Sequence, residues 1–177
     1  MQATHRALVG LIAGWGVLTT GAAARAAEHE LGVGIHHWEA LDDLDVDNVE
    51  IDESGTSALL VYRVNPAGLF AFELDVEYFG DGFAGATEEA LAPQFFVLLG
   101  NDFYAGIGVG VTLADDLPSG DDVSDPFYAA RVGFAFPLLP RLRLDLNGNY
   151  QTGTFEDLDQ ADSDTITVGA HLRLRIK

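Results

Sequence analysis

Residues 31–176 consist of segments of about ten residues in which apolar side chains recur at every second position. The gaps between these segments alternate strictly between long and short. The long gaps are 41–56, 80–91, 113–126 and 152–164, and the short gaps are 66–68, 101–102 and 137–141. Apolar residues at a period of two predict β-strands with one dry face and one polar face. The alternating gap lengths therefore predict a series of hairpins whose long loops all lie at one end.

Acidic residues are concentrated in the long gaps. These gaps hold 20 of the 28 Asp and Glu residues of the chain and contain no Lys or Arg. The formal net charge of −19 argues against nucleic acid as a partner, because phosphate binding requires clustered basic residues. The chain has no Cys, which excludes disulfides, thiolate metal sites and cysteine nucleophiles. The predicted set of hairpins therefore has one strongly anionic end, where the long loops lie.

The first 26 residues differ from the rest of the chain. Arg6 precedes an apolar stretch at 7–24, which is followed by the small-residue sequence Ala24-Arg25-Ala26. A positive start, an apolar middle and a small-residue exit predict a secretory signal peptide over 1–26 and a mature domain over 27–177. The rival interpretation is a membrane anchor helix, but four Gly residues lower its helix propensity.

Eight strands are predicted, and their lengths suit the crossing of a bilayer. A tilted transmembrane strand needs about 9–11 residues, which is longer than a typical soluble strand. The predicted fold class is all-β, an eight-stranded antiparallel up-and-down transmembrane β-barrel, because closure satisfies every backbone group within a membrane. The strands are expected at 31–40, 57–65, 69–79, 92–100, 103–112, 127–136, 142–151 and 165–176.

The polar faces of these strands combine carboxylates with Arg and have no Lys before Lys177. A water-facing sheet would normally carry more Lys, whereas Arg and carboxylates suit a narrow lumen where they pair with one another. An eight-stranded barrel is just wide enough for side chains to fill. We therefore expect a plugged, ion-paired interior instead of a wide pore. The predicted lumen charge network comprises Arg63, Glu73, Asp75, Glu77, Arg131, Arg143, Asp145, Arg173 and Arg175.

Aromatic residues gather near the predicted strand ends, which is typical of side chains at the two lipid–water interfaces. We expect one girdle near the long loops and another near the short turns. The first would contain Trp38, Tyr78, Phe79, Phe127, Tyr128 and Tyr150, and the second Phe70, Phe103, Tyr104 and Phe136. For the segment 92–100 the alternation does not predict which side chains point into the barrel, because the segment is apolar on both faces.

The signal sequence, eight strands, short turns such as Asn101-Asp102 and about 150 mature residues together resemble the small eight-stranded outer-membrane barrels of Gram-negative bacteria, the OmpA/OmpX-like class. The resemblance covers about residues 28–177. It implies residence in the outer membrane, with membrane lipid and lipopolysaccharide as surroundings and the barrel assembly machinery as a transient partner. It also implies a monomer, and no catalytic residues are shared by the class.

The histidines and serines of the mature chain are weak candidates for metal binding or catalysis. His36 and His37 are adjacent on a predicted strand, so their imidazoles point to opposite faces and cannot chelate one metal together. We expect them in structural roles at the external rim of the barrel. No His stands at a short fixed spacing from any Ser, which argues against a Ser–His hydrolase acting on lipid A. His171 is expected to form hydrogen bonds inside the barrel. Catalytic residues and a bound cofactor are expected to be absent.

Asp43, Asp45 and Asp47 form a D-x-D-x-D string in the first long gap. An EF-hand loop is excluded because Asn48 stands where its glycine belongs and Ser54 where its final glutamate belongs. The two remaining interpretations are a solvated acidic surface and loose binding of Ca²⁺ or Mg²⁺ by the loops.

The predicted function is that of a non-enzymatic integral outer-membrane barrel that supports envelope integrity or interacts through acidic external loops. Two alternatives stay open. One is a soluble periplasmic barrel that binds an apolar ligand, since a barrel with an apolar interior would show the same alternation. The other is a lipid A-modifying barrel enzyme.

Overall fold

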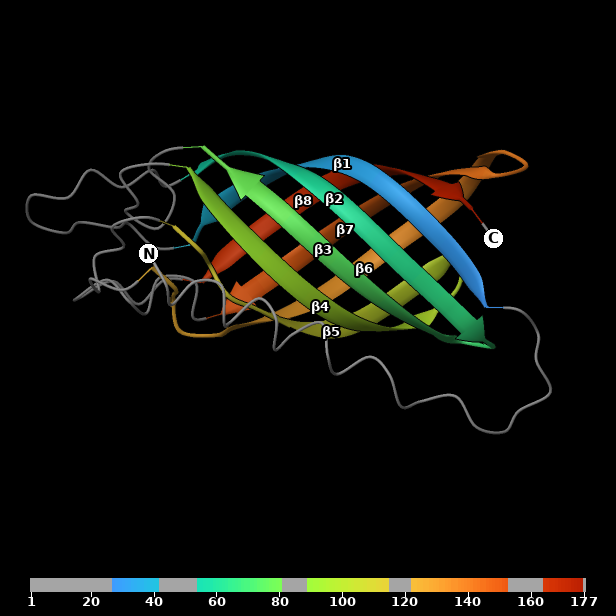
Figure 1. Cartoon of the computed structure of the whole chain (residues 1–177), viewed down its shortest axis with the longest axis horizontal. Coiled ribbons are helices and arrows are strands. Elements are labelled where there is room, and N and C mark those ends of the chain that lie inside the picture. Colours follow the sequence, from blue (N-terminus) through green and yellow to red (C-terminus); the bar gives the residue numbers. More distant parts are fainter. Residues whose placement is uncertain (1–26, 42–53, 81–88, 115–121, 153–163, 177) are drawn as a thin grey trace, which may run out of the picture.

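In this computed structural model, the described residues are 27–41, 54–80, 89–114, 122–152 and 164–176, and within them eight antiparallel strands form a closed barrel (Figure 1). Each strand pairs with its sequence neighbours, and β1 closes the barrel by pairing with β8. The predicted fold is confirmed. The strands are β1 (Glu28–Ala40), β2 (Ser54–Ala67), β3 (Phe70–Phe79), β4 (Ala90–Gly100), β5 (Phe103–Gly110), β6 (Phe127–Leu139), β7 (Leu142–Thr152) and β8 (Thr165–Arg175).

The short turns join β2 to β3, β4 to β5 and β6 to β7 at one end of the barrel, and the start of β1 and the end of β8 lie at the same end (Figure 1). Two glycines make the first two of these turns possible. Gly68 has a φ of 74° and Gly100 a φ of 117°, a region that other residues rarely adopt. A Cβ on Gly100 would also lie 2.2 Å from the carbonyl oxygen of Phe103.

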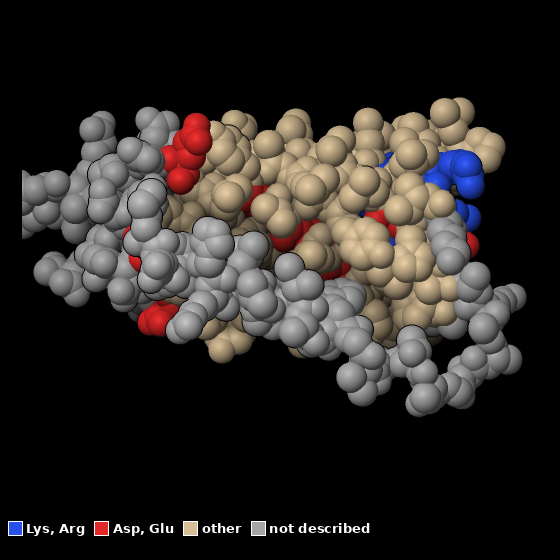
Figure 2. Space-filling view, viewed as in Figure 1, with Lys and Arg blue, Asp and Glu red and all other residues tan. Residues whose placement is uncertain are grey.

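The barrel is apolar outside and polar inside, as the alternation predicted. In β3 the side chains of Glu73, Asp75 and Glu77 are fully buried, while Phe70 and Tyr78 are exposed on the outer wall. Figure 2 shows a wall covered mainly by uncharged residues, with Arg side chains gathered at the short-turn end. A charged interior inside an apolar wall reverses the usual arrangement of a soluble protein.

The observed strand bounds differ from the predicted ones by at most three residues at either end of a strand. β6 runs through Pro137 to Leu139, so the expected turn at 137–141 shrinks to Pro140-Arg141. A register shift between Pro137 and Leu139 accompanies this extension. Proline is tolerated at such irregularities because it need not donate to the sheet there. The sequence-based turn was therefore too long.

The prediction of two aromatic girdles is partly wrong. Trp38, Phe79, Phe127 and Tyr104 are buried inside the barrel, with exposed fractions of 1–3%. The reason is strand parity, since each shares a face with the inward-facing residues of its own strand, such as His36 for Trp38 and Gly106 for Tyr104. The members that are exposed on the outer wall are Tyr78, Tyr128, Tyr150, Phe70 and Phe103, while Phe136 is half-buried.

Among the described residues, no helix is long and apolar enough to cross a membrane. The expected signal peptide at 1–26 lies outside the described residues, and its cleavage stays a prediction.

Candidate functional site: the polar interior of the barrel

The centre of the interior is a cluster of ion pairs built around Glu73 on β3. Arg63 on β2 donates from Nε to Glu73 Oε2 at 2.5 Å. Arg131 on β6 bonds Glu73 Oε1 through Nη1, and the same nitrogen donates to Asp75 Oδ2 at 2.7 Å. Its Nε donates to Asn149 Oδ1 at 2.5 Å. One carboxylate thus receives two guanidinium groups from opposite sides of the barrel.

A second cluster lies toward the short turns and is centred on Arg173 of β8. Its Nη2 donates to Asp145 Oδ2 at 2.6 Å, and its Nη1 lies 3.2 Å from Glu30 Oε2. Tyr104 also donates its hydroxyl to Asp145, at 2.7 Å. The side chains of Arg173, Asp145 and Glu30 are at most 4% exposed. The interior charges therefore form connected groups instead of separate pairs.

Two aromatic rings support the guanidinium groups. The guanidinium carbon of Arg131 lies 3.7 Å from the ring centroid of Phe96 on β4, and that of Arg63 lies 4.4 Å from the Tyr104 centroid. Such cation–π contacts gain strength where water is excluded. The sequence did not reveal these partners, because the register of β4 was ambiguous and Tyr104 was expected on the outer wall.

A third cluster, toward the long loops, surrounds the carboxylate of Glu77. Ser57 donates its hydroxyl to Oε1, and His36 Nδ1 lies 2.9 Å from the same oxygen. Gln94 donates from Nε2 to Oε2 at 2.8 Å. The other imidazole nitrogen of His36, Nε2, lies 3.0 Å from Nε2 of His171. The sequence placed His36 at the external rim, whereas the structure places it inside the barrel.

Ser57, His36 and Glu77 are the three residue types of a hydrolase triad, yet their arrangement differs from one. In a triad the serine hydroxyl faces the imidazole that takes its proton. Here both Ser57 and His36 bond the same carboxylate oxygen, and the free side of the His36 ring faces His171. The geometry therefore holds the carboxylate in place and does not activate the serine.

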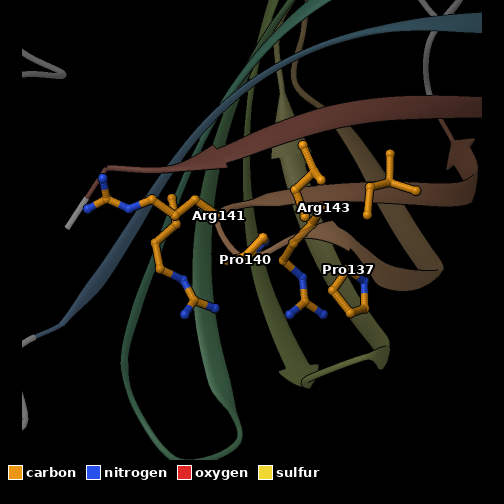
Figure 3. A pocket seen from close by; sticks show the side chains of 7 residues that line it. Pro137, Pro140, Arg141 and Arg143 are labelled. Carbon is orange, nitrogen blue, oxygen red and sulfur yellow. The ribbon is translucent and has the colours of Figure 1, made fainter.

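Two of the predicted network residues lie at the short-turn rim. Arg143 bonds Asp102, which is 67% exposed, and Arg175 Nη2 lies 3.2 Å from Glu28 Oε2. Both arginines border an open cavity of about 320 Å³ between apolar side chains and guanidinium groups (Figure 3). Its lining comprises Pro137, Leu138, Leu139, Pro140, Arg141, Arg143 and Arg175.

The placement of these residues changes the charge balance of the interior. The predicted network has four carboxylates and five arginines, but two of the arginines lie at the rim and one more carboxylate, Glu30, is buried. Counted as ionised, the buried carboxylates exceed the buried guanidinium groups by two. Among the described residues, the buried set comprises Glu30, Glu73, Asp75, Glu77 and Asp145 against Arg63, Arg131 and Arg173.

The candidate calcium ligands Asp43, Asp45 and Asp47 lie outside the described residues, so binding of Ca²⁺ or Mg²⁺ there stays a prediction. Within the described part of the chain, no group of three or more His, Cys, Asp or Glu side chains is arranged to hold a metal ion.

The solved structures that share the fold of the chain include three outer-membrane proteins. Neisserial surface protein A (NspA) superposes with a TM-score of 0.54 at 13% identity, covering 86% of this chain and all of its own. OprG from Pseudomonas aeruginosa gives 0.51 at 13% identity, covering 86% of this chain and 95% of its own. The fold is that of the small outer-membrane barrels.

The outer membrane protein AlkL, solved in DMPC lipid bilayers, gives a TM-score of 0.50 at 15% identity and covers 90% of this chain and 94% of its own. No protein-family model matches the sequence, and neither does any curated protein. At these identities the likeness establishes the barrel fold alone.

Proposed function

We propose that the chain is a non-enzymatic integral protein of the bacterial outer membrane, a rigid barrel that presents acidic loops at one end. The observation that carries the proposal is the reversed distribution of polarity. Among the described residues, five carboxylates and three arginines are buried within the barrel, and large apolar side chains cover its outer wall. A wall of this kind is stable in contact with lipid and costly in contact with water.

The exposure of individual side chains supports contact with lipid. Ile107 on β5 is 71% exposed, Ile35 on β1 is 67% exposed and Val168 on β8 is 54% exposed. Residues of this kind occur on every strand of the barrel, so the apolar wall has no polar side to face water. Closure leaves no unpaired strand edge, which a bilayer requires.

A soluble barrel that binds an apolar ligand fits the geometry poorly. The side chains that fill the interior are ion pairs and hydrogen-bonded amides, such as Arg131, Asp75 and Asn149. An apolar ligand would leave these groups without their partners, which costs far more free energy than its burial gains.

A lipid-modifying enzyme is also disfavoured by the position of the reactive residues. Ser57 is 4% exposed and its hydroxyl is bonded to Glu77 on the inner face of the barrel. A lipid substrate would lie against the outer wall, on the other side of the sheet. We therefore propose a structural or surface-interaction role, in which the acidic long gaps act as external loops and the short turns face the periplasm.

Fractionation of cells that express the chain tests this proposal. We expect the protein to stay with the outer membrane after osmotic shock and to require detergent for extraction. Its band on a gel should shift when the sample is boiled, because an intact barrel resists unfolding by detergent alone. Release by osmotic shock together with heat-independent migration would refute a membrane barrel. A lipid A mass spectrum that changes on expression would refute the non-enzymatic role.

A further inference from the structure

Two imidazoles meet inside the barrel at the seam where it closes. His36 on β1 and His171 on β8 have their Nε2 atoms 3.0 Å apart, with ring centroids separated by 5.1 Å. The register pairs each histidine with a glycine, His36 with Gly169 and His171 with Gly34. A Cβ on Gly169 would lie 1.9 Å from His36 Cδ2, and one on Gly34 would lie 2.5 Å from His171 Cδ2. Both rings therefore occupy space that only glycine leaves open.

The other partners of the two rings determine which nitrogens carry protons. His36 Nδ1 lies 2.9 Å from the Glu77 carboxylate, so Nδ1 donates and the neutral ring has a lone pair on Nε2. The Asn147 amide nitrogen lies 3.0 Å from His171 Nε2 and donates to it, which also requires a lone pair there. Two lone pairs would then face each other at 3.0 Å. A shared proton or a metal ion between them resolves this conflict, and so does a rotated Asn147 amide, which would let His171 Nε2 carry a hydrogen toward His36.

The charge of the surrounding interior favours a divalent cation. Within the part of the chain that the structure describes, the buried carboxylates exceed the buried arginines by two when all are counted as ionised. A proton shared between the imidazoles would supply one positive charge, whereas a divalent ion would supply both. The Asn147 side-chain oxygen is buried and has no hydrogen-bond partner, while the nitrogen of the same amide touches His171. Rotation of this amide would turn an oxygen ligand toward the two imidazoles, and it would give up the bond from Asn147 Nδ2 to Asp145 Oδ1 at 3.2 Å.

We propose that the interior binds one divalent transition-metal ion, of the kind that prefers imidazole, between His36 Nε2 and His171 Nε2, with Asn147 Oδ1 as a third ligand. Two nitrogens bound to one metal at about 2.0–2.1 Å lie roughly 2.9–3.4 Å apart for angles between a right angle and a tetrahedral one. The observed separation of 3.0 Å falls within this range. Glu77 would orient His36 through Nδ1, as carboxylates do for metal-bound imidazoles. Zn²⁺, Cu²⁺ and Ni²⁺ suit such ligands.

The site adds ion binding to the scaffold role proposed above. Buried aromatic side chains lie next to the site on the side of the long loops. The rings of Trp38 and Phe79 are in edge-to-face contact there, with centroids 6.3 Å apart. We therefore expect the metal to enter while the barrel folds.

The test refolds the mature chain into detergent with Zn²⁺, Cu²⁺ or Ni²⁺, removes loose metal by dialysis, and measures the metal retained per folded barrel.

The expected result is roughly one retained ion per barrel for at least one of the three metals and a higher melting temperature than for protein refolded with chelator, because metal binding couples to folding. His36→Gln and His171→Gln should each lose the retained ion. His37→Gln is the matched control, because His37 is the next residue of β1 but is exposed on the outer wall. It should bind metal as the wild type does.

Two results would overturn the proposal. Wild-type barrels that retain no metal under all three conditions would show that a hydrogen, and not a metal ion, lies between the two imidazoles. Metal retention that survives in the folded His36→Gln and His171→Gln barrels would place the ion elsewhere. If a variant does not fold, the wild-type stoichiometry and the Cu²⁺ electron paramagnetic resonance spectrum decide, since two nitrogen ligands split its lines characteristically and oxygen ligands do not.

Discussion

Replacement of Arg131 by methionine is expected to lower the free energy of unfolding of the barrel by about 3–5 kcal/mol, the range found when one partner of a buried ion pair is removed. Arg131 is 1% exposed and bonds Glu73 and Asp75 with the same nitrogen. Methionine retains much of the apolar stem but removes the charge and the donor to Asn149. Two buried carboxylates would then share less positive charge, and the contact with the Phe96 ring would be lost.

Urea unfolding of the protein refolded into lipid vesicles measures this effect, with the fluorescence of Trp38 as a probe because that side chain is buried in the barrel. Arg143→Met is the matched control, since Arg143 pairs with an exposed carboxylate, Asp102, at the rim. Exposed ion pairs contribute only about 0–1 kcal/mol. Equal losses for Arg131→Met and Arg143→Met would contradict the assignment of Arg131 to a closed, dry network.

Replacement of Ile107 by arginine is expected to cost about 2–4 kcal/mol, the range for a charge on the lipid-facing wall of a barrel at the bilayer midplane. Ile107 lies in the middle of β5 and is 71% exposed. In water such a substitution on an exposed position would be nearly neutral. A large cost would therefore show that lipid, and not water, surrounds this side chain.

Phe103→Arg is the control for this prediction, because Phe103 begins the same strand, lies on the same face and is 69% exposed. It lies at the short-turn end, where the cost of a charge falls to about 0–1 kcal/mol. Unfolding of both variants by urea in vesicles gives the two free energies. Similar costs at both positions, or a negligible cost at Ile107, would count against a bilayer around the middle of the barrel.

The fold could be predicted from the sequence because side-chain alternation is a local property. In β3, the alternating polarity of successive residues predicts that Glu73, Asp75 and Glu77 share one face of the strand and that Phe70 and Tyr78 share the other. The same rule fails where both faces are apolar, as around Phe96 in β4. Position along a strand was also a poor guide to orientation. Trp38 and Phe79 lie near strand ends, yet parity directs them into the barrel.

The contacts within the interior could not be predicted, because they depend on how the strands are staggered around the barrel. His36 and His171 are separated by 135 residues and meet only because β1 and β8 close with one particular register. Glu30 was missed because β1 begins three residues earlier than expected. Arg143 and Arg175 have the same parity as the interior residues of β7 and β8, but they lie at the rim. Strand parity therefore predicts the face of the sheet on which a side chain lies, whereas the stagger of the strands determines how deep in the barrel it lies.

Spin labelling along β6 tests most directly whether the wall of the barrel faces lipid. The chain has no Cys, so single cysteines can be placed at the outward positions Tyr128, Ala130, Val132, Phe134 and Phe136 without removing a native thiol. In refolded vesicles, a lipid-facing wall predicts that collision with dissolved oxygen is greatest at Val132 and falls toward both ends, while collision with a water-soluble nickel chelate shows the opposite profile. Equal access of the nickel chelate to Val132 and Tyr128 would contradict the account.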